Sequence, residues 1–333
     1  MKSAYEEECR AKEGKHINTI KEDLEALVDK RLHWTLLTLP ILGIVIFTIL
    51  PLVFMICMAF TSYSKVGDHL TIFHWVGLKN FSTVLGMGNS IGKTFWSVLG
   101  WTLIWAVLAT FLNYILGMIL AIVINRKTTR IKGFWRFCFM LSAAIPQFVS
   151  LLLMRTMLKD NGLINNLLVQ AGLISSPLPF LTNATWARAT VVIINLWVGI
   201  PFTMMQVTGI LQNIPGELYE AARVDGAGPV TIFFKITLPY MLFVTTPYLI
   251  TTFTGNINNF NVIYLLTAGA PVPVGATAGK TDLLVTWLYK LTVDLQYFNV
   301  GAVVGILTFV ILAVVSLITY RNTGSYKNEE GFQ

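Results

Sequence analysis

Charged residues are scarce in this chain. Asp, Glu, Lys and Arg make up only 12% of its 333 residues, whereas 55% of the residues are hydrophobic and the mean hydropathy is +0.66. In an ordinary soluble domain about a quarter of the residues are charged. The composition therefore excludes a soluble domain and predicts a protein that crosses a membrane several times.

Cysteine is equally rare. Cys9, Cys57 and Cys138 lie far apart, one in the N-terminal tail and two within apolar stretches. This spacing provides neither a disulfide framework nor a metal site. The first apolar run is long and follows a charged tail, which predicts a retained membrane span and not a cleaved signal peptide.

The apolar stretches themselves are almost free of charge. Apart from Arg136 and Arg188, which each lie within three residues of the start of a stretch, Arg155 is the only charged residue within them, and no Asp, Glu or His lies near the centre of a stretch. An ion-coupled carrier normally needs such groups or broken helices. No phosphate-binding loop is present either. We therefore expect no catalytic site, metal or cofactor in this chain, and the energy for any transport has to come from another subunit.

Six apolar stretches are long enough to cross a membrane, so the sequence predicts an all-α membrane protein with about six transmembrane helices. The stretches are residues 34–62, 94–124, 134–158, 187–212, 236–266 and 298–320. Pro146 is predicted to kink the third. The membrane domain is thus expected at 34–320, between an N-terminal tail at 1–33 and a C-terminal tail at 321–333.

Within the N-terminal tail, apolar residues recur at helical spacing among Lys, Glu and Asp over residues 17–32. This pattern predicts an amphipathic helix that lies on the membrane surface. The alternative is a solvated helix that packs on another subunit.

The net charge of +7 reflects membrane topology. Sixteen of the 24 Lys and Arg residues lie in the two tails, in the loop after the second stretch and in the region 213–239. Basic loops favour the cytoplasmic side. Both termini and the loop 213–239 are therefore expected in the cytoplasm, and no nucleic-acid partner is expected.

The loop 213–239 contains the most distinctive spacing in the chain. Glu220-Ala221-Ala222 is followed by Gly226 and then by Ile236, Leu238 and Pro239. The pattern predicts a short helix that ends at Gly226 in a left-handed conformation, after which Pro229 opens the next helix.

At the start of this short helix, Asn213 and Pro215 suit a cap and a first turn. A small, rigid helix between membrane spans can transmit force from another subunit. We predict that its coupling residues are Leu218, Glu220, Ala221, Ala222, Asp225 and Gly226.

Polar residues form stripes on three of the predicted spans, which indicates faces that avoid lipid. The stripes are Gln147 after the Pro146 kink, then Asn195, Val198, Gly199 and Phe202, and finally Thr252, Gly255, Asn256 and Asn259. Asparagine and glutamine can pair with sugar hydroxyls, and Phe202 offers a ring face for a pyranose. Hydrogen bonding between neighbouring helices explains each residue equally well.

These motifs resemble those of bacterial carbohydrate ABC importers, and most closely the larger permease subunit of maltose/maltodextrin-type systems. The similarity runs from about residue 94 to 320. It depends on the loop motif described above, on Asn258-Asn259-Phe260 with Leu265-Leu266-Thr267, and on the run Thr281-Asp282-Leu283-Leu284-Val285.

The resemblance implies an ABC-importer permease fold whose cytoplasmic coupling helix contacts ATPase subunits. It implies a heterodimer with a second, homologous permease, two ATP-binding cassette subunits that hold ATP-Mg, and an extracytoplasmic sugar-binding protein, all at the bacterial plasma membrane. The implied mid-membrane sugar site comprises the stripe residues together with Asn261.

The chain also departs from the maltose-binding pattern of the family. Ala143 and Phe202 stand where that pattern has tyrosine, and Gly255 stands where it has phenylalanine. The roomier pocket makes either a maltodextrin or another oligosaccharide, such as a galacto-oligosaccharide, the expected substrate. The alternatives from other classes are an ion-coupled sugar carrier and a non-transporting membrane scaffold.

Overall fold

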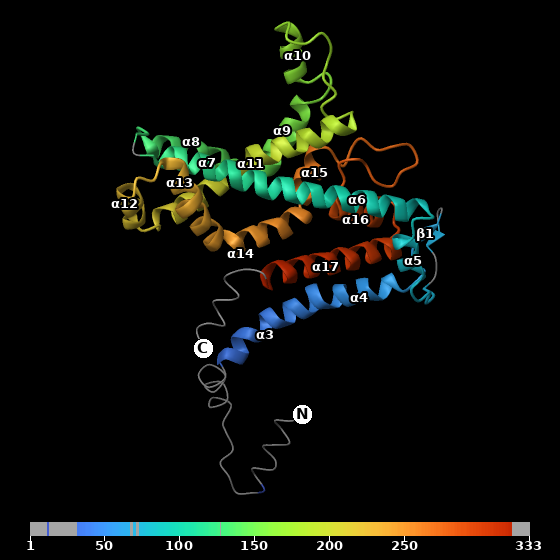
Figure 1. Cartoon of the computed structure of the whole chain (residues 1–333). Helices are drawn as coiled ribbons and strands as arrows, with labels where there is room; N and C mark the ends of the chain where they lie inside the picture. Colours follow the sequence, from blue (N-terminus) through green and yellow to red (C-terminus); the bar gives the residue numbers. More distant parts are fainter. Residues whose placement is uncertain (1–11, 13–31, 67–68, 71–72, 127, 322–333) are drawn as a thin grey trace. The chain divides into compact units, whose positions relative to one another are not determined.

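The computed structural model describes residues 12, 32–66, 69–70, 73–126 and 128–321 (Figure 1). The amphipathic helix expected at 17–32, except for its last residue, and nearly all of the C-terminal tail lie outside these residues. The chain divides into two compact units, Met1–Cys57 and Met58–Gln333.

The first unit contains most of one apolar helical segment. It consists of α3 (Leu32–Ile44), the π-helical turn η1 (Val45–Ile49) and α4 (Leu50–Ala59), whose last residues belong to the second unit. Residues Leu36–Ala59 are long and apolar enough to cross a membrane. Leucine, isoleucine and phenylalanine occur on all sides of this segment, as in a helix surrounded by lipid.

The second unit begins with a short extramembrane segment. The strands β1 (Lys65–Val66) and β2 (His69–Leu70) pair antiparallel, and α5 (Lys79–Leu85) follows. The Asn80 amide donates hydrogen bonds to the carbonyls of Ala59 (2.8 Å) and Thr61 (2.7 Å) and accepts one from Asn299. This buried side chain therefore fixes the segment to the start of the last span.

The remaining helices carry the spans. They are α6 (Ser90–Val107), η2 (Leu108–Leu112), α7 (Asn113–Asn125), α8 (Lys132–Ala144), α9 (Gln147–Met157), α10 (Leu163–Gln170), α11 (Ala184–Gln212), α12 (Gly216–Val224), α13 (Pro229–Ile232), η3 (Phe233–Thr237), α14 (Leu238–Ile257), α15 (Phe260–Leu266), α16 (Leu284–Tyr289), η4 (Lys290–Asp294) and α17 (Phe298–Arg321). Apart from β1, β2 and an isolated bridge, the regular structure of the described residues is helical, which confirms the predicted all-α class.

The described part has five helices long and apolar enough to span a membrane, and six if the pair α8 and α9 counts as one bent span. That pair bends by 76° at the break before Gln147. The bend confirms the predicted effect of Pro146, which cannot donate a backbone hydrogen bond. The prediction of about six spans is therefore confirmed.

The fifth span is interrupted where the sequence predicted a continuous helix. α14 ends at Ile257, and the Asn259 side chain accepts a hydrogen bond from Val262 N at the start of α15. Asn259 therefore does not continue the helical face that begins at Thr252. That prediction was wrong, because an asparagine at the start of a helix caps it and favours a break.

Two buried apolar clusters pack the spans of the second unit. One contains Trp101, Trp105 and Val191, and the other contains Tyr114 and Met204. On α6–α7 and on α11 alike, the first cluster comes earlier in the helix and the second comes later. The residues between them occupy a middle layer of the bundle.

Candidate functional site

The middle layer is polar. On the second span it contains Thr110 and Asn113, on α11 it contains Asn195, and on α14 it contains Asn256, all of them buried. Buried amides are costly between apolar clusters unless they find partners. What each amide contacts therefore distinguishes packing from ligand binding.

A cavity of about 330 Å³ opens at this level between the break in the third span and α11. Its lining comprises Ser142, Ala144, Ile145, Pro146, Gln147, Ser150, Asn195, Trp197, Val198, Gly199 and Phe202. The break creates the space, because Pro146 separates α8 from α9 and Gln147 begins the new helix. The volume lies at the lower end of the range for small-molecule sites.

Asn195 is the residue in this cavity whose hydrogen bonding is incomplete. Its side chain is only 6% exposed, and among the described residues its Nδ2 has no hydrogen-bond partner. A buried donor without a partner costs about 1–3 kcal/mol. A hydroxyl or carbonyl oxygen of a bound ligand can remove that cost.

Asn113 was missed by the sequence analysis and lies directly behind the cavity wall. A methyl group on Gly199 would come within 2.7 Å of Asn113 Oδ1, so the glycine permits the close approach of the two helices. Asn113 Nδ2 donates to Ala109 O, but its Oδ1 has no partner within the described part of the chain. Asn195 precedes Gly199 by one helical turn on the same face. The two amides thus leave one donor and one acceptor unused in neighbouring positions.

The structure brings together half of the predicted sugar-binding residues. Gln147, Asn195, Val198, Gly199 and Phe202 all line the cavity, whereas Thr252, Gly255, Asn256, Asn259 and Asn261 do not. Ser142, Ala144, Ile145, Ser150 and Trp197 also line it and were not predicted as site residues. Of these five residues, only Ser150 could have been predicted from the helical spacing, because it lies three residues after Gln147 and therefore on the same helical face.

Asn256 is bonded to other residues of the chain. Its Nδ2 donates to Thr110 Oγ1 at 3.0 Å, and its backbone carbonyl oxygen accepts from Trp105 Nε1 at 3.0 Å. Both contacts join α14 to the second span. The packing interpretation therefore fits Asn256 better, while the ligand interpretation fits Asn195.

The loop after α11 folds as predicted at its C-terminal end. Gly226 has φ +78°, its N–H donates to Arg223 O, and the N–H of Ala227 donates to Ala222 O. This pair of bonds is the Schellman motif. Pro229 begins α13, as expected.

The predicted start of α12 was partly wrong. Asn213 is the C-cap of α11, and Pro215 occupies the N-cap position of α12 without a side-chain hydrogen bond. α11 continues to Gln212, so Asn213 ends one helix and does not begin the next.

α12 presents an outward face with few internal contacts. Leu218 is 45% exposed and Val224 is 87% exposed, while Ala222 is half-buried. The Tyr219 hydroxyl shares a hydrogen bond with Thr237 Oγ1 and holds the helix against the start of the fifth span. Figure 1 shows α12 and α13 beyond the ends of α7 and α11, at the opposite end from the start of α6.

A larger groove of about 860 Å³ lies beneath this loop and includes Tyr219, Arg223 and Phe233 in its lining. It is at the ends of the spans and not at their centre. The smaller cavity is the better candidate for substrate, because it contains a buried amide without a partner.

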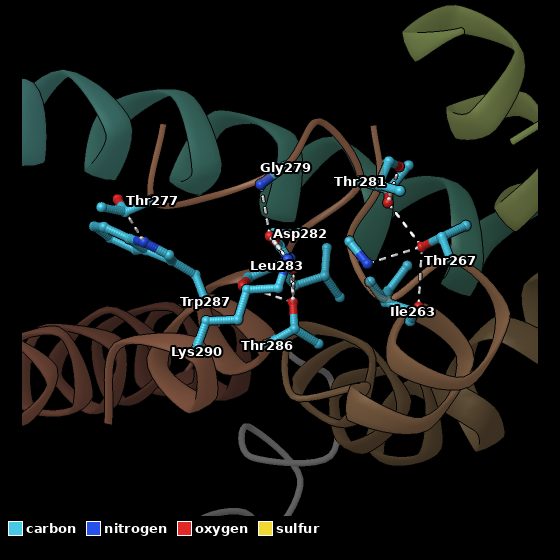
Figure 2. A network of polar contacts seen from close by, with 12 residues as sticks. Ile263, Thr267, Thr277, Gly279, Thr281, Asp282, Leu283, Thr286, Trp287 and Lys290 are labelled. Carbon is cyan, nitrogen blue, oxygen red and sulfur yellow. Dashed lines mark hydrogen bonds and ion pairs between the residues drawn. The ribbon is translucent and has the colours of Figure 1, made fainter. Parts of the chain in front are cut away.

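At the other end of the bundle, the run Thr281–Val285 belongs to a buried polar network (Figure 2). The carboxylate of Asp282 is fully buried and accepts bonds from Gly279 N (2.7 Å), Thr286 Oγ1 (2.9 Å) and Lys290 Nζ (2.6 Å). Thr267 and Thr281 share a hydrogen bond of 2.8 Å. The network closes the loop between α15 and α16.

Comparisons with known proteins agree with this architecture. Residues 113–323 match the family described as "Binding-protein-dependent transport system inner membrane component". The chain is 35% identical over 333 residues to the galactooligosaccharides transport system permease protein GanP of Bacillus subtilis, with 99% of this chain and 79% of GanP covered. It is 36% identical over 332 residues to the maltodextrin transport system permease protein MdxF of the same organism, with 95% and 75% covered.

A solved structure has the same fold. It is a bacterial alginate ABC transporter in complex with an alginate pentasaccharide-bound periplasmic protein, and one of its chains superimposes with a TM-score of 0.70 at 23% identity. The match covers 89% of this chain and 94% of that one.

Proposed function

Because the chain belongs to the family of binding-protein-dependent transport system inner membrane components, we propose that it translocates an oligosaccharide as the permease subunit of an ATP-driven ABC importer. Family membership makes it a multi-pass inner-membrane protein that works with a substrate-binding protein, and a transport subunit of this kind is not an enzyme. It favours the importer over an ion-coupled carrier or a scaffold.

The observation that carries the proposal is the unpartnered amide of Asn195 in a cavity at mid-span. A sugar hydroxyl both donates and accepts, so it can satisfy Asn195 Nδ2 when the amide turns towards the cavity. Trp197 and Phe202 in the lining provide ring faces for the apolar side of a pyranose. The absence of charge from the cavity lining suits a neutral sugar.

The substrate in this proposal is a maltodextrin-like oligosaccharide. One relative is named for maltodextrin and the other for galacto-oligosaccharides, so a galacto-oligosaccharide is the alternative. Residues Thr252, Gly255, Asn259 and Asn261 remain part of the proposed path for the sugar, on the fifth span and outside the cavity that the other five line.

The energy in this proposal comes from two ATPase subunits that bind ATP-Mg and contact α12, and a second permease completes the membrane pore. The exposed Leu218 and the rigid end of α12 at Gly226 support this role, together with Glu220, Ala221, Ala222 and Asp225. Closure of the ATPases moves α12 and tilts the spans about the cavity.

The function and the cavity are tested together in proteoliposomes that contain the complete transporter. The wild type is expected to take up maltodextrins or galacto-oligosaccharides from a panel of labelled sugars, with ATP inside and binding protein outside. If neither class is taken up or stimulates ATP hydrolysis, the proposed function is wrong.

In the same assay, Asn195→Ala is expected to weaken transport because a sugar hydrogen bond worth roughly 0.5–1.5 kcal/mol is lost. That corresponds to an effect of about 2- to 13-fold. Asn256→Ala is the matched control: it should lower the melting temperature, since it breaks the bond to Thr110, and leave substrate preference unchanged. The reverse pattern would show that the sugar contacts Asn256 and that Asn195 only packs.

The proposed orientation places both termini and α12 in the cytoplasm, as the distribution of Lys and Arg favours. Cysteine in place of the exposed Val224 is then expected to react only with a reagent that enters the cell. Cysteine in place of Val274, in the loop before α16, should react with an impermeant maleimide from outside. Labelling of both positions from one side would contradict this topology.

A further inference from the structure

Another hollow, smaller than both the groove and the cavity described above, lies at the end of the bundle opposite α12. It has a volume of about 260 Å³ and is lined by the first turns of α6 and α11 and by the loop 273–282. Both helices run from this hollow towards the region of α12, because α7 continues α6 and α11 leads directly into α12 (Figure 1). In the orientation proposed above, the hollow faces the extracytoplasmic side.

The hollow is positively charged. Lys93, Arg188 and Lys280 contribute to its lining, and the only acid among the lining residues is Asp282. The carboxylate of Asp282 is already neutralised by Lys290 at 2.6 Å and accepts two further hydrogen bonds. Three cations therefore remain without a compensating charge in the lining.

Arg188 is held in a fixed position. Its Nε donates to Lys280 O at 2.8 Å, and its guanidinium lies 4.4 Å from the centre of the Trp101 ring. In the described part of the protein, no acceptor bonds to its two terminal NH2 groups. A guanidinium oriented in this way is suited to a carboxylate, which it can bind with two parallel hydrogen bonds.

Size distinguishes between possible ligands. Sites for small organic ligands occupy about 300–1,000 Å³, so a hollow of about 260 Å³ lies just below the range for such sites. It does admit a protruding side chain. The hydroxyls of Ser90, Thr94 and Ser97 in its lining are further donors for a carboxylate.

The loop beside the hollow adds an apolar contact surface. Val272 is 51% exposed and Val274 fully exposed, and Lys280 N donates to Pro271 O across the base of the loop. The Asp282 network fixes the same base (Figure 2). Exposed apolar residues on a rigid loop next to a charged hollow are the combination that a protein partner recognises.

We propose that this hollow accepts an acidic side chain of the extracytoplasmic sugar-binding protein, with Val272 and Val274 in contact around it. The inference rests on the proposed function, because that function supplies the partner. Charge complementarity favours an acidic protein surface over a neutral sugar.

The test measures the affinity of the sugar-loaded binding protein for the complete transporter in nanodiscs. The probe is the binding protein that stimulates wild-type ATP hydrolysis. Lys280→Glu and Lys93→Glu are each expected to raise its Kd at least tenfold, and wild-type binding should weaken with added salt. Both lysines are exposed, so folding and basal ATP hydrolysis should not change. Lys159→Glu, an exposed lysine outside the hollow, is the matched control and should leave the Kd unchanged.

The outcomes separate this inference from the proposed function. If no binding protein stimulates the wild type, the proposed function fails. If the wild type responds but both hollow variants bind as tightly as it does, the docking site is wrong. Two other results would overturn it as well: loss of the second permease on purification, which makes the hollow a subunit interface, or a changed response to anionic lipid at unchanged Kd, which makes it a headgroup site.

Discussion

Gly226→Val is expected to weaken the coupling between sugar binding and ATP hydrolysis strongly while the protein still inserts and assembles. Gly226 has φ +78°, and a Cβ added there would meet no other atom of this chain within 4 Å. The cost is therefore backbone strain and not a clash. A left-handed conformation costs an L-residue roughly 1–2 kcal/mol, and a β-branched residue is the least tolerant of it.

That strain acts on the two backbone hydrogen bonds of the Schellman motif that ends α12. When residue 226 leaves the left-handed region, the bonds from the N–H groups of residues 226 and 227 to Arg223 and Ala222 are lost. A shift of 1–2 kcal/mol lowers the ratio of intact to frayed helix ends by roughly 5- to 30-fold. Stimulated ATP hydrolysis and uptake should fall by up to a similar factor.

Gly228→Val is the matched control. Gly228 has φ −73°, a conformation that valine adopts readily, and it too has nothing within 4 Å of an added Cβ. This variant should retain transport. Equal loss in both variants would show that the loop tolerates no added bulk, and wild-type transport in Gly226→Val would show that α12 does not couple the subunits.

Local signals were sufficient to predict the end of α12 and the bend in the third span. A glycine after a short helix and a proline within an apolar run each act through their own backbone, so neighbouring residues carry the whole cause. The start of α12 was predicted less well. Asn213 can end one helix or begin the next, and the preceding sequence does not decide how far α11 continues.

The roles of the buried amides could not be predicted from periodicity. Asn195 and Asn256 belong to stripes with the same i, i+3, i+4, i+7 spacing, yet one has an unused donor in a cavity and the other bonds to Thr110. The two amides differ in their neighbours in space, and those neighbours are far away in the sequence. The polar layer also includes Asn113, and the close packing of its amide depends on Gly199 of another helix.

Lys290→Met is expected to cause the largest loss of stability, because it leaves the fully buried carboxylate of Asp282 without its cation. Removing one partner of a buried ion pair costs about 3–5 kcal/mol. Asp282 is 0% exposed, whereas Lys290 is 14% exposed and can turn towards water. Asp282→Asn should therefore be milder than Lys290→Met, although both remove the same bridge.

Thermal unfolding of the purified transporter measures this asymmetry, and the double variant Asp282→Asn with Lys290→Met sharpens it. The double variant is expected to be more stable than Lys290→Met alone, since the neutral amide at position 282 can accept from Gly279 N through its oxygen and donate to Thr286 Oγ1 through its NH2 group, without a buried charge. Lys159→Met, an exposed lysine with no ion pair among the described residues, should have little effect. If Lys290→Met unfolds at the wild-type temperature, the pair does not hold the loop between α15 and α16. Other contacts would then have to maintain the loop geometry on which the charged hollow depends.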